Sequence, residues 1–510
     1  MALFQSILTL LTLAVLLLQV SRHLRIPYPT MLAVAGVAVA ALPWASALSI
    51  DPHLALALFI APAILDSAFD FPLRAIRTYW LPLLALAVLA VLVTTAAVAW
   101  AGVAFAGLPI AAAVVLGAIV SPPDAAAAAA MLNRPDLPRS TATVLKGESL
   151  LNDAVALLIF GVGLQIAQNG GGVLHTLPQL ALAIPGGLLL GIAAGFIGSF
   201  VMQFLAGTLG GILFQFVVAF SIWLLADHLH LSAILAMVAA AMTVAQRDSR
   251  MSPLDRLHSN AVWGLLVFVL NVLAFLFVGL EARGIVRNLD SDRLGQDLRF
   301  AGIVLVIVIV VRIVLVLLYN RAVQPLYRRR GLGTAPSIKQ AIIASWCGMR
   351  GMVTLAAALA LPEEFPRRDL VVLSALAVVL GTLVIQGLTL EPLIRLLNFP
   401  QDASQEREKA RVRALLTDSA MLSLQARDEP TAAALRQELQ LEMLDHQTPT
   451  AGIGGLDGLR LDTIRVQRQL LRRMRHECLV EEEIYRAIEQ ELDLHELAST
   501  RKLQLQLIDS

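Results

Sequence analysis

Long runs of apolar residues, separated by short charged or turn-rich stretches, occupy the first 400 residues of the chain. A run of roughly 17 or more apolar residues is long enough to cross a bilayer as a helix. The first run has no basic segment before it and no obvious small-residue cleavage site after it, so we expect it to be retained as a span. We expect thirteen spanning helices, near residues 3–19, 28–45, 52–70, 79–106, 109–131, 148–167, 175–205, 210–227, 230–246, 259–281, 301–320, 339–361 and 369–397.

Beyond residue 400 the pattern changes to charged helical stretches, expected near 404–446 and 461–497 with a Gly-containing loop between them. The whole chain is 57% hydrophobic and 15% charged, with a mean hydropathy of +0.74. Residues 401–510 carry 15 Lys/Arg and 20 Asp/Glu, whereas residues 1–400 carry 24 and 18. We therefore predict an all-α polytopic membrane protein with a transmembrane domain at 1–400 and a cytosolic helical tail at 401–510.

The charge of the loops predicts an orientation. With an odd number of spans, fifteen Lys and Arg residues fall in one set of loops and six in the opposite set. Because cytoplasmic loops are enriched in Lys and Arg, we expect the N-terminus outside and the tail in the cytoplasm. The net charge of +1 gives no electrostatic footprint for nucleic acid.

The stretch KGESLLNDAVALLIFGVG, residues 146–163, places ionisable residues inside an apolar span. Residues four apart share a helix face, so Glu148 aligns with Asn152 and Ser149 aligns with Asp153. A buried carboxylate costs several kcal/mol unless it faces water, pairs with a cation or holds a proton. Asp153 is therefore either a functional carboxylate or a structural one bound to a neighbouring helix. Glu148 is a candidate for half of a structural ion pair.

The stretch AIVSPPDAAAAAAML, residues 118–132, predicts a broken helix. Pro122 and Pro123 lack an N–H group, and each disfavours helix in the residue before it. Broken membrane helices leave backbone groups free and can form ion sites near the bilayer midplane. Asp124 follows the break directly, where it either caps the next half-helix or contributes to such a site.

An arginine occupies a third apolar span, in ASWCGMRGMVTLAAALALP. Arg350 retains its proton, so it must pair with a carboxylate or cap carbonyl oxygens. We expect Glu148 as its partner, because Asp153 and Asp124 have other expected uses. The flanking glycines favour a close approach or a local break.

Asp66, Asp70 and Arg312 are further ionisable residues that lie in predicted spans. Asp66 and Asp70 are four residues apart near the inner end of a span, where they anchor that end or where Asp66 lines an inner vestibule. Arg312 lies near the middle of a span, and the sequence assigns it no partner.

Several classes of chemistry have no support in the sequence. There is no Walker A loop, so ATP is not the expected energy source, and there is no Cys/His cluster with metal-ligand spacing. We expect no cofactor and no enzymatic activity. An intramembrane aspartyl protease would need two catalytic aspartates, and neither Asp124 nor Asp153 carries a GxGD element.

Together these stretches resemble sodium:proton antiporters of the cation:proton antiporter-1 type, which include bacterial NhaP-like proteins and animal sodium/proton exchangers. GESLLNDAVALLIF is similar to that family's signature, and SPPD resembles its broken-helix element SPTDP. GMRGMVTLAAALALP resembles its G-x-RG span, LVIQGLTLEPLIRLL its final span, and PAILDSAF an early span with an acidic residue. The resemblance covers residues 1 to 398 and leaves the tail unmatched.

The resemblance implies a homodimer in the plasma membrane, with a scaffold half, a moving core half, inverted repeats and two crossed, broken helices. Asp153 would bind either a monovalent cation or a proton, and Asn152 would stabilise the site. Ser149 and a backbone carbonyl near Pro123 would complete the ligands, with Asp124 nearby. Glu148 and Arg350 would form the structural ion pair. The family often has Thr at position 123 and Pro at position 125, so Pro123 and Ala125 depart from its pattern.

The resemblance, with its Asn-Asp form at residues 152 and 153, therefore implies electroneutral exchange of sodium or lithium for protons through Asp153. Potassium/proton exchange on the same fold is the alternative, and a cation channel gated by the tail is a second one from another class. Saturable flux that depends on a counter-ion would argue against the channel.

Overall fold

Helices form every regular element in the described part of the chain. The chain divides into two compact units, residues 1–132 with 138–399, and residues 133–137 with 400–510. In the second unit residues 463–471 are helical, and most of the predicted tail helices lie outside the described residues. The structure, a computed structural model, describes residues 12–21, 23, 27–40, 56–71, 73–124, 139–169, 173–205, 208–247, 253–287, 294–330, 336–398, 463–471 and isolated positions of the tail.

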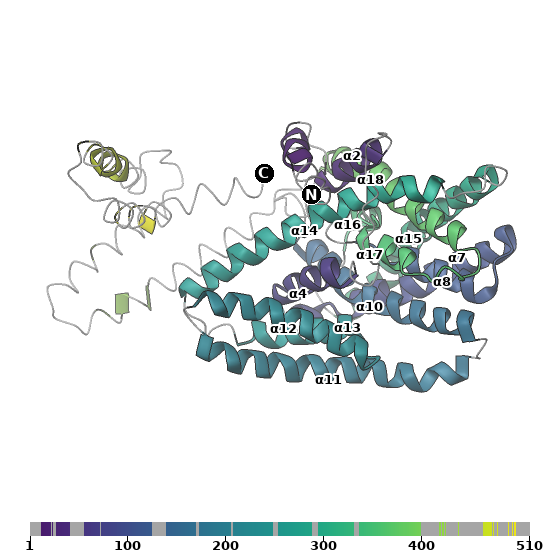
Figure 1. Ribbon diagram of the computed structural model, residues 1–510, viewed down its shortest axis with the longest axis horizontal. Coiled ribbons are helices and arrows are strands. Elements are labelled where there is room, and N and C mark those ends of the chain that lie inside the picture. The colour runs from purple at the N-terminus through teal and green to yellow at the C-terminus, as the bar shows by residue number, and fades with distance from the viewer. Residues whose placement is uncertain are drawn as a thin grey trace. The chain divides into compact units, whose positions relative to one another are not determined.

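The first unit, residues 1–132 with 138–399, is called the membrane unit, and its helices follow the predicted spans in order (Figure 1). Their bounds are α2 Tyr28–Ala40, the π-helical turn η1 Leu56–Ile60, α4 Ala61–Phe69, α5 Leu73–Thr78, α6 Trp80–Leu84, the π-helical turn η2 Ala85–Leu89, α7 Ala90–Ala106, α8 Ile110–Val120, α10 Arg139–Asn169, α11 Val173–Leu205, α12 Leu209–His228, α13 Ala233–Ala245, α14 Pro253–Arg287, α15 Leu294–Arg330, α16 Ile338–Trp346, α17 Met352–Leu359 and α18 Arg368–Leu397.

The polytopic all-α architecture is confirmed. Seven helices in the described residues are long and apolar enough to cross a membrane, and shorter apolar helices fall on other predicted spans. The division of residues 175–246 into three helices matches α11, α12 and α13. The total of thirteen stays a prediction, because residues 3–11 and the alanine-rich segment after Asp124 lie outside the described residues.

One boundary differs from the prediction and changes the position of a key residue. The helix expected at 148–167 begins at Arg139, so Glu148 lies in its third turn rather than near its start. Lys146 is exposed on this added segment, whereas Glu148 is buried. The search for long apolar runs missed these turns because they combine exposed polar residues with a buried face.

Small residues let α11 lie directly against α13. Figure 1 shows α11, α12 and α13 running side by side. A Cβ atom on Gly187 would lie 2.7 Å from the carbonyl oxygen of Ser232, and one on Gly191 would collide with the carbonyl oxygen of Ala236. This spacing of four residues brings two helix backbones into contact, which is how helices associate where lipid removes the hydrophobic driving force.

Close packing of the same kind fixes α8, which carries the first predicted break. A Cβ atom on Gly117 would lie 2.5 Å from the carbonyl oxygen of Thr95 on α7. The buried face of α8 packs into an apolar cluster with α15, α17 and α18, which includes Val115, Val308 and Ala357. The end of α8 therefore lies in the protein interior, away from the lipid-facing surface.

We expect Gly191→Ala to destabilise the membrane unit by about 1–3 kcal/mol, because the new methyl group overlaps backbone that cannot move aside. Gly161→Ala is the matched control: Gly161 is also inside a helix, but a Cβ there would meet nothing within 4 Å. This control should be neutral or stabilising by about 0.5–1 kcal/mol. Thermal unfolding of the purified protein in detergent measures both, and equal melting temperatures would contradict the packing described.

Candidate functional site

The first helix break is at Ser121. Helix α8 ends at Val120, and the next residues, Ser121 to Asp124, are not helical. The hydroxyl of Ser121 donates a hydrogen bond to the carbonyl oxygen of Ala118 at 3.1 Å. The two prolines cannot donate to the last turn of α8, so its carbonyl oxygens need other partners.

The second break separates α16 from α17, as the glycines around Arg350 suggested. Helix α16 ends at Trp346 and α17 begins at Met352, with residues 347–351 outside helix between them. The capping box of Ser337 and Gln340 fixes the start of α16. The predicted span 339–361 is therefore two half-helices with their inner ends buried.

The two breaks are in direct contact. The backbone N–H of Asp124 donates to the carbonyl oxygen of Met349 at 2.7 Å. A Cβ atom on Gly351 would overlap the carboxylate of Asp124, so only glycine admits that carboxylate beside the first turn of α17. The N-terminus of a helix carries a partial positive charge, which favours a carboxylate at this position.

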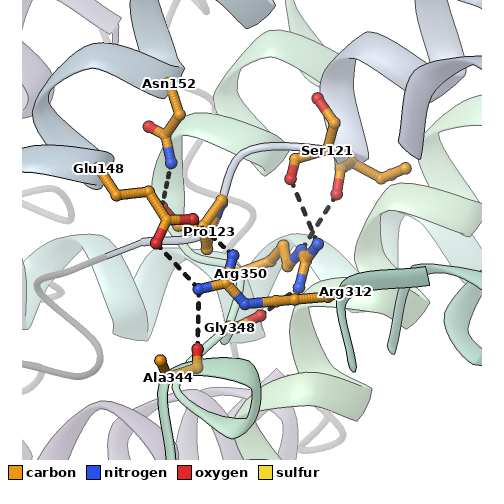
Figure 2. Close-up of polar contacts among 9 residues, drawn as sticks. Ser121, Pro123, Glu148, Asn152, Arg312, Ala344, Gly348 and Arg350 are labelled. Carbon is orange, nitrogen blue, oxygen red and sulfur yellow. Dashed lines mark hydrogen bonds and ion pairs between the residues drawn. The ribbon is translucent and has the colours of Figure 1, made fainter. Parts of the chain in front are cut away.

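Arg350 connects the breaks through backbone carbonyl groups (Figure 2). Its side chain is 1% exposed. Nε donates to the carbonyl oxygen of Val120 at 3.1 Å and Nη2 donates to that of Ser121 at 3.2 Å. Nη1 donates to the carbonyl oxygen of Gly348. The guanidinium thus binds the carbonyl end of α8, where the helix dipole is negative.

Glu148 pairs with Arg312, not with Arg350. Nη1 and Nη2 of Arg312 donate to the two carboxylate oxygens of Glu148 at 2.6 and 3.1 Å. Nη2 also donates to the carbonyl oxygen of Ala344 at the end of α16, at 3.1 Å. The side chains of Arg312 and Glu148 are 3% and 1% exposed, so this two-point pair is buried.

The expected Glu148–Arg350 pair is therefore corrected. Of the two acceptors considered for Arg350, a carboxylate or carbonyl oxygens, the elimination chose the carboxylate of Glu148 and left Arg312 without a partner. In the structure, helix ends supply the acceptors of Arg350, and the carboxylate goes to Arg312.

Asn152 joins α10 to the first break. Its side-chain Nδ2 donates to the carbonyl oxygen of Pro123 at 3.1 Å, and the residue is fully buried. Its Oδ1 atom is buried without a hydrogen-bond partner in the described part of the chain. The predicted proximity of Asn152 and the Pro123 carbonyl is thus seen in the structure, and Oδ1 is left available to a ligand.

Asp153 follows Asn152 and is 8% exposed. Within the described residues no hydrogen bond or ion pair reaches its carboxylate. Its negative charge is near enough to that of Asp124 for the two to repel each other. Ser149, one turn earlier on α10, is half-buried and has contacts of its own. The structure therefore brings Asn152 and Asp153 of α10 to the break at Pro123 and Asp124, with Ser149 one turn earlier on the same helix.

Comparisons with known proteins bear on the family and the fold of the chain. A family model described as "Sodium/hydrogen exchanger, transmembrane" matches residues 8–396. The chain belongs to the sodium/hydrogen exchanger family. This is a family of transporters, and the match ends just before the charged tail.

Two bacterial relatives and one solved archaeal structure are similar to this exchanger. An uncharacterized Na⁺/H⁺ exchanger of Mycobacterium tuberculosis is 27% identical over 93% of this chain and 92% of its own length. A sodium, potassium, lithium and rubidium/H⁺ antiporter of Bacillus subtilis is 29% identical over 76% of this chain and 61% of its own. The solved sodium proton antiporter MjNhaP1 of Methanocaldococcus jannaschii shares the fold, with a TM-score of 0.61, 16% identity, and coverage of 77% and 99%.

Asp66 and Asp70 of the exchanger line a cavity of about 410 Å³ between α4, α11, α12, α13 and α14. Asp66 is half-buried and Asp70 is exposed. Neither Asn152 nor Asp153 lines this cavity. That the cavity is an inner vestibule stays a prediction.

Sequence reasoning missed one residue that holds the site together. The backbone N–H of Arg350 donates to Oγ1 of Thr382 on α18 at 3.0 Å. Thr382 lies in an ordinary apolar run, so only the three-dimensional contact identifies it. Arg312 carried a signal, since an arginine in mid-span requires a buried acceptor.

Breaking the buried pair should cost far more than breaking an exposed one. We expect Arg312→Met to destabilise the exchanger by about 3–5 kcal/mol, because the carboxylate of Glu148 is left buried and unpaired. Arg367→Met removes the partner of Asp297, where the arginine is 40% exposed, and should cost at most about 1 kcal/mol. Thermal unfolding of both variants, with Arg312→Met/Glu148→Gln as a third, measures the difference. If the double variant is no more stable than Arg312→Met, the unpaired carboxylate is not the cause.

Proposed function

We propose that the protein exchanges sodium, or lithium, for protons across the membrane, with Asp153 alternately holding the cation and the proton. The observation that carries this proposal is the assignment of the two arginines. Arg312 is bound to Glu148 and Arg350 is bound to helix-end carbonyl groups. The buried Asp153 therefore has no fixed positive partner in the described residues, and a mobile cation is needed to neutralise it.

Competition for this one carboxylate couples the two fluxes. An ionised carboxylate is strongly disfavoured in a low-dielectric environment, whereas a carboxylate that holds sodium or a proton is not. The loaded site can therefore change the side to which it opens, and the empty, charged site cannot. Each turnover then carries sodium one way and a proton the other.

The neighbouring groups have separate roles in this proposal. Asn152 holds the break through the Pro123 carbonyl and presents Oδ1 to the cation. Ser149 supplies a hydroxyl from the same helix face, and carbonyl oxygen at Pro123 supplies a backbone ligand. Pro123 has no hydroxyl, so the cation has one side-chain ligand fewer than a threonine would give there.

Asp124 does not add a second exchangeable charge in this scheme. Its carboxylate lies against Gly351 at the start of α17, and it has contacts of its own. With the amide of Asn152 beside Asp153, one carboxylate charge is neutralised by either one sodium ion or one proton. Exchange is then one for one and moves no net charge.

The assembly and orientation belong to the same proposal. We infer a homodimer in the plasma membrane, with the N-terminus outside and the tail in the cytoplasm. The excess of Lys and Arg in one set of loops supports the orientation. The family resemblance supports the dimer.

Potassium is the alternative substrate, on one specific observation. A relative at 29% identity is named for sodium, potassium, lithium and rubidium as well as protons. Proton movement can be measured in vesicles given sodium, lithium or potassium across a range of pH. A response to sodium and lithium but not to potassium supports sodium/proton exchange. A dominant response to potassium supports potassium/proton exchange.

Asp153→Asn should abolish sodium-dependent proton movement in everted vesicles, because a neutral amide neither binds a proton nor requires a cation. Asp227→Asn makes the same change at an exposed position on α12 and should leave the rate unchanged. The protein level of each variant is measured alongside. Exchange at the wild-type rate by the Asp153 variant would refute the assignment.

Exchange should not respond to the membrane potential. In proteoliposomes clamped at different potentials with a potassium ionophore, the initial rate at a fixed sodium gradient should stay the same, because one positive charge replaces another. A rate that rises and falls with the imposed potential would show that more than one proton moves for each sodium.

A further inference from the structure

One side chain outside the proposed ligand set has no hydrogen bond although it is completely enclosed. Gln386 on α18 is 0% exposed, and neither Oε1 nor Nε2 has a partner in the described part of the chain. Leaving a buried amide unpaired costs free energy that an apolar side chain of similar size would avoid. An unpaired buried amide in a native structure is explained if the amide forms hydrogen bonds in another conformational state of the molecule.

The neighbours of Gln386 place it against the second helix break. One turn earlier, Oγ1 of Thr382 accepts the backbone N–H of Arg350 at 3.0 Å. Three residues later, Oγ1 of Thr389 accepts the indole N–H of Trp346 at 2.9 Å. Because α18 contacts one end of the break before Gln386 and the other end after it, the amide lies opposite residues 347–349.

A second helix reaches the same place. A Cβ atom on Gly387 would overlap the hydroxyl of Thr30 on α2 and lie 3.6 Å from Sδ of Met349. That hydroxyl donates to the carbonyl oxygen of Leu383 at 2.8 Å. The backbone of α18 next to Gln386 is thus packed between α2 and the break.

We propose that Gln386 is a positioning residue of the exchange cycle, whose amide binds backbone groups of residues 347–349 in a state other than the one described. This proposal rests on the proposed function. In the present state the carbonyl oxygens of Gly348 and Met349 accept from Arg350 and from the N–H of Asp124. Backbone outside helix has donors and acceptors to exchange, so a small shift of the break, as the site changes its occupant, offers Gln386 the partners it lacks.

No hydrogen bond in the described part of the chain joins the Gln386 amide to the proposed cation ligands, so the proposal predicts an effect on turnover and not on sodium binding. Gln215 provides a contrast. Its Oε1 accepts from Ser259 at 2.7 Å and from the indole N–H of Trp263 at 2.6 Å, so this amide is already hydrogen-bonded in the present structure.

The test compares the same substitution at both amides. Gln386→Leu should lower the maximum rate of exchange in proteoliposomes about three- to tenfold, the worth of one hydrogen bond. The sodium concentration at half-maximal rate should stay unchanged, and the melting temperature should stay the same or rise. Gln386→Asn keeps an amide and should recover part of the rate. Gln215→Leu should lower the melting temperature, because two buried donors lose their acceptor.

The maximum rate and the melting temperature together distinguish a positioning role of Gln386 from a purely structural one. A Gln386→Leu protein with the wild-type maximum rate overturns the proposal, and so does one that fails to fold or loses melting temperature together with rate, because Gln386 then serves the present structure. A change confined to half-saturating sodium also overturns it. If the wild-type protein shows no sodium-dependent proton movement, the proposed function fails. A rate lost without loss of stability supports the positioning role.

Discussion

The exchanger must compensate helix ends that lie inside the membrane unit, where water is scarce. Helices α8 and α16 end there with carbonyl groups, and α17 begins there with N–H groups. Arg350 binds the end of α8, Arg312 binds the end of α16 through Ala344, and the carboxylate of Asp124 lies at the start of α17. Without these three charges, both breaks would leave unpaired backbone dipoles in a low-dielectric interior.

This use of charge decides what is left for ion exchange. Arg350 binds carbonyl oxygens and Arg312 binds Glu148, so neither of these buried arginines is paired with the buried carboxylate of Asp153. A guanidinium on Asp153 would compete with any mobile cation for the same oxygens. The contacts that stabilise the broken helices are thus compatible with the proposed exchange at Asp153, although neither arginine belongs to the proposed ligand set.

The fold and most of the site were predictable because their signals are local. Apolar runs mark the helices, Pro122 and Pro123 mark the first break, and the spacing of Glu148, Ser149, Asn152 and Asp153 places them along one helix. The partner of Glu148 was not predictable in this way. Two buried arginines compete for it, and the choice depends on which of them lies nearer to free carbonyl groups, a property of tertiary contact. The same holds for Thr382 and Gln386, which sit in an apolar run that only packing relates to the break.

Gly348 shows how tightly the two arginines are linked. A Cβ atom there would overlap the side chain of Arg312 and lie 3.1 Å from Nη1 of Arg350, so both arginines pass over this one residue. Like charges tolerate such proximity only because Glu148 and several carbonyl oxygens surround them. Since these bonds join α8, α10, α15 and α16 through buried groups, a shift of residues 347–351 cannot leave Asp124 or Asn152 unaffected. Movement at the second break is therefore transmitted to Asn152, next to the carboxylate for which we propose ion binding.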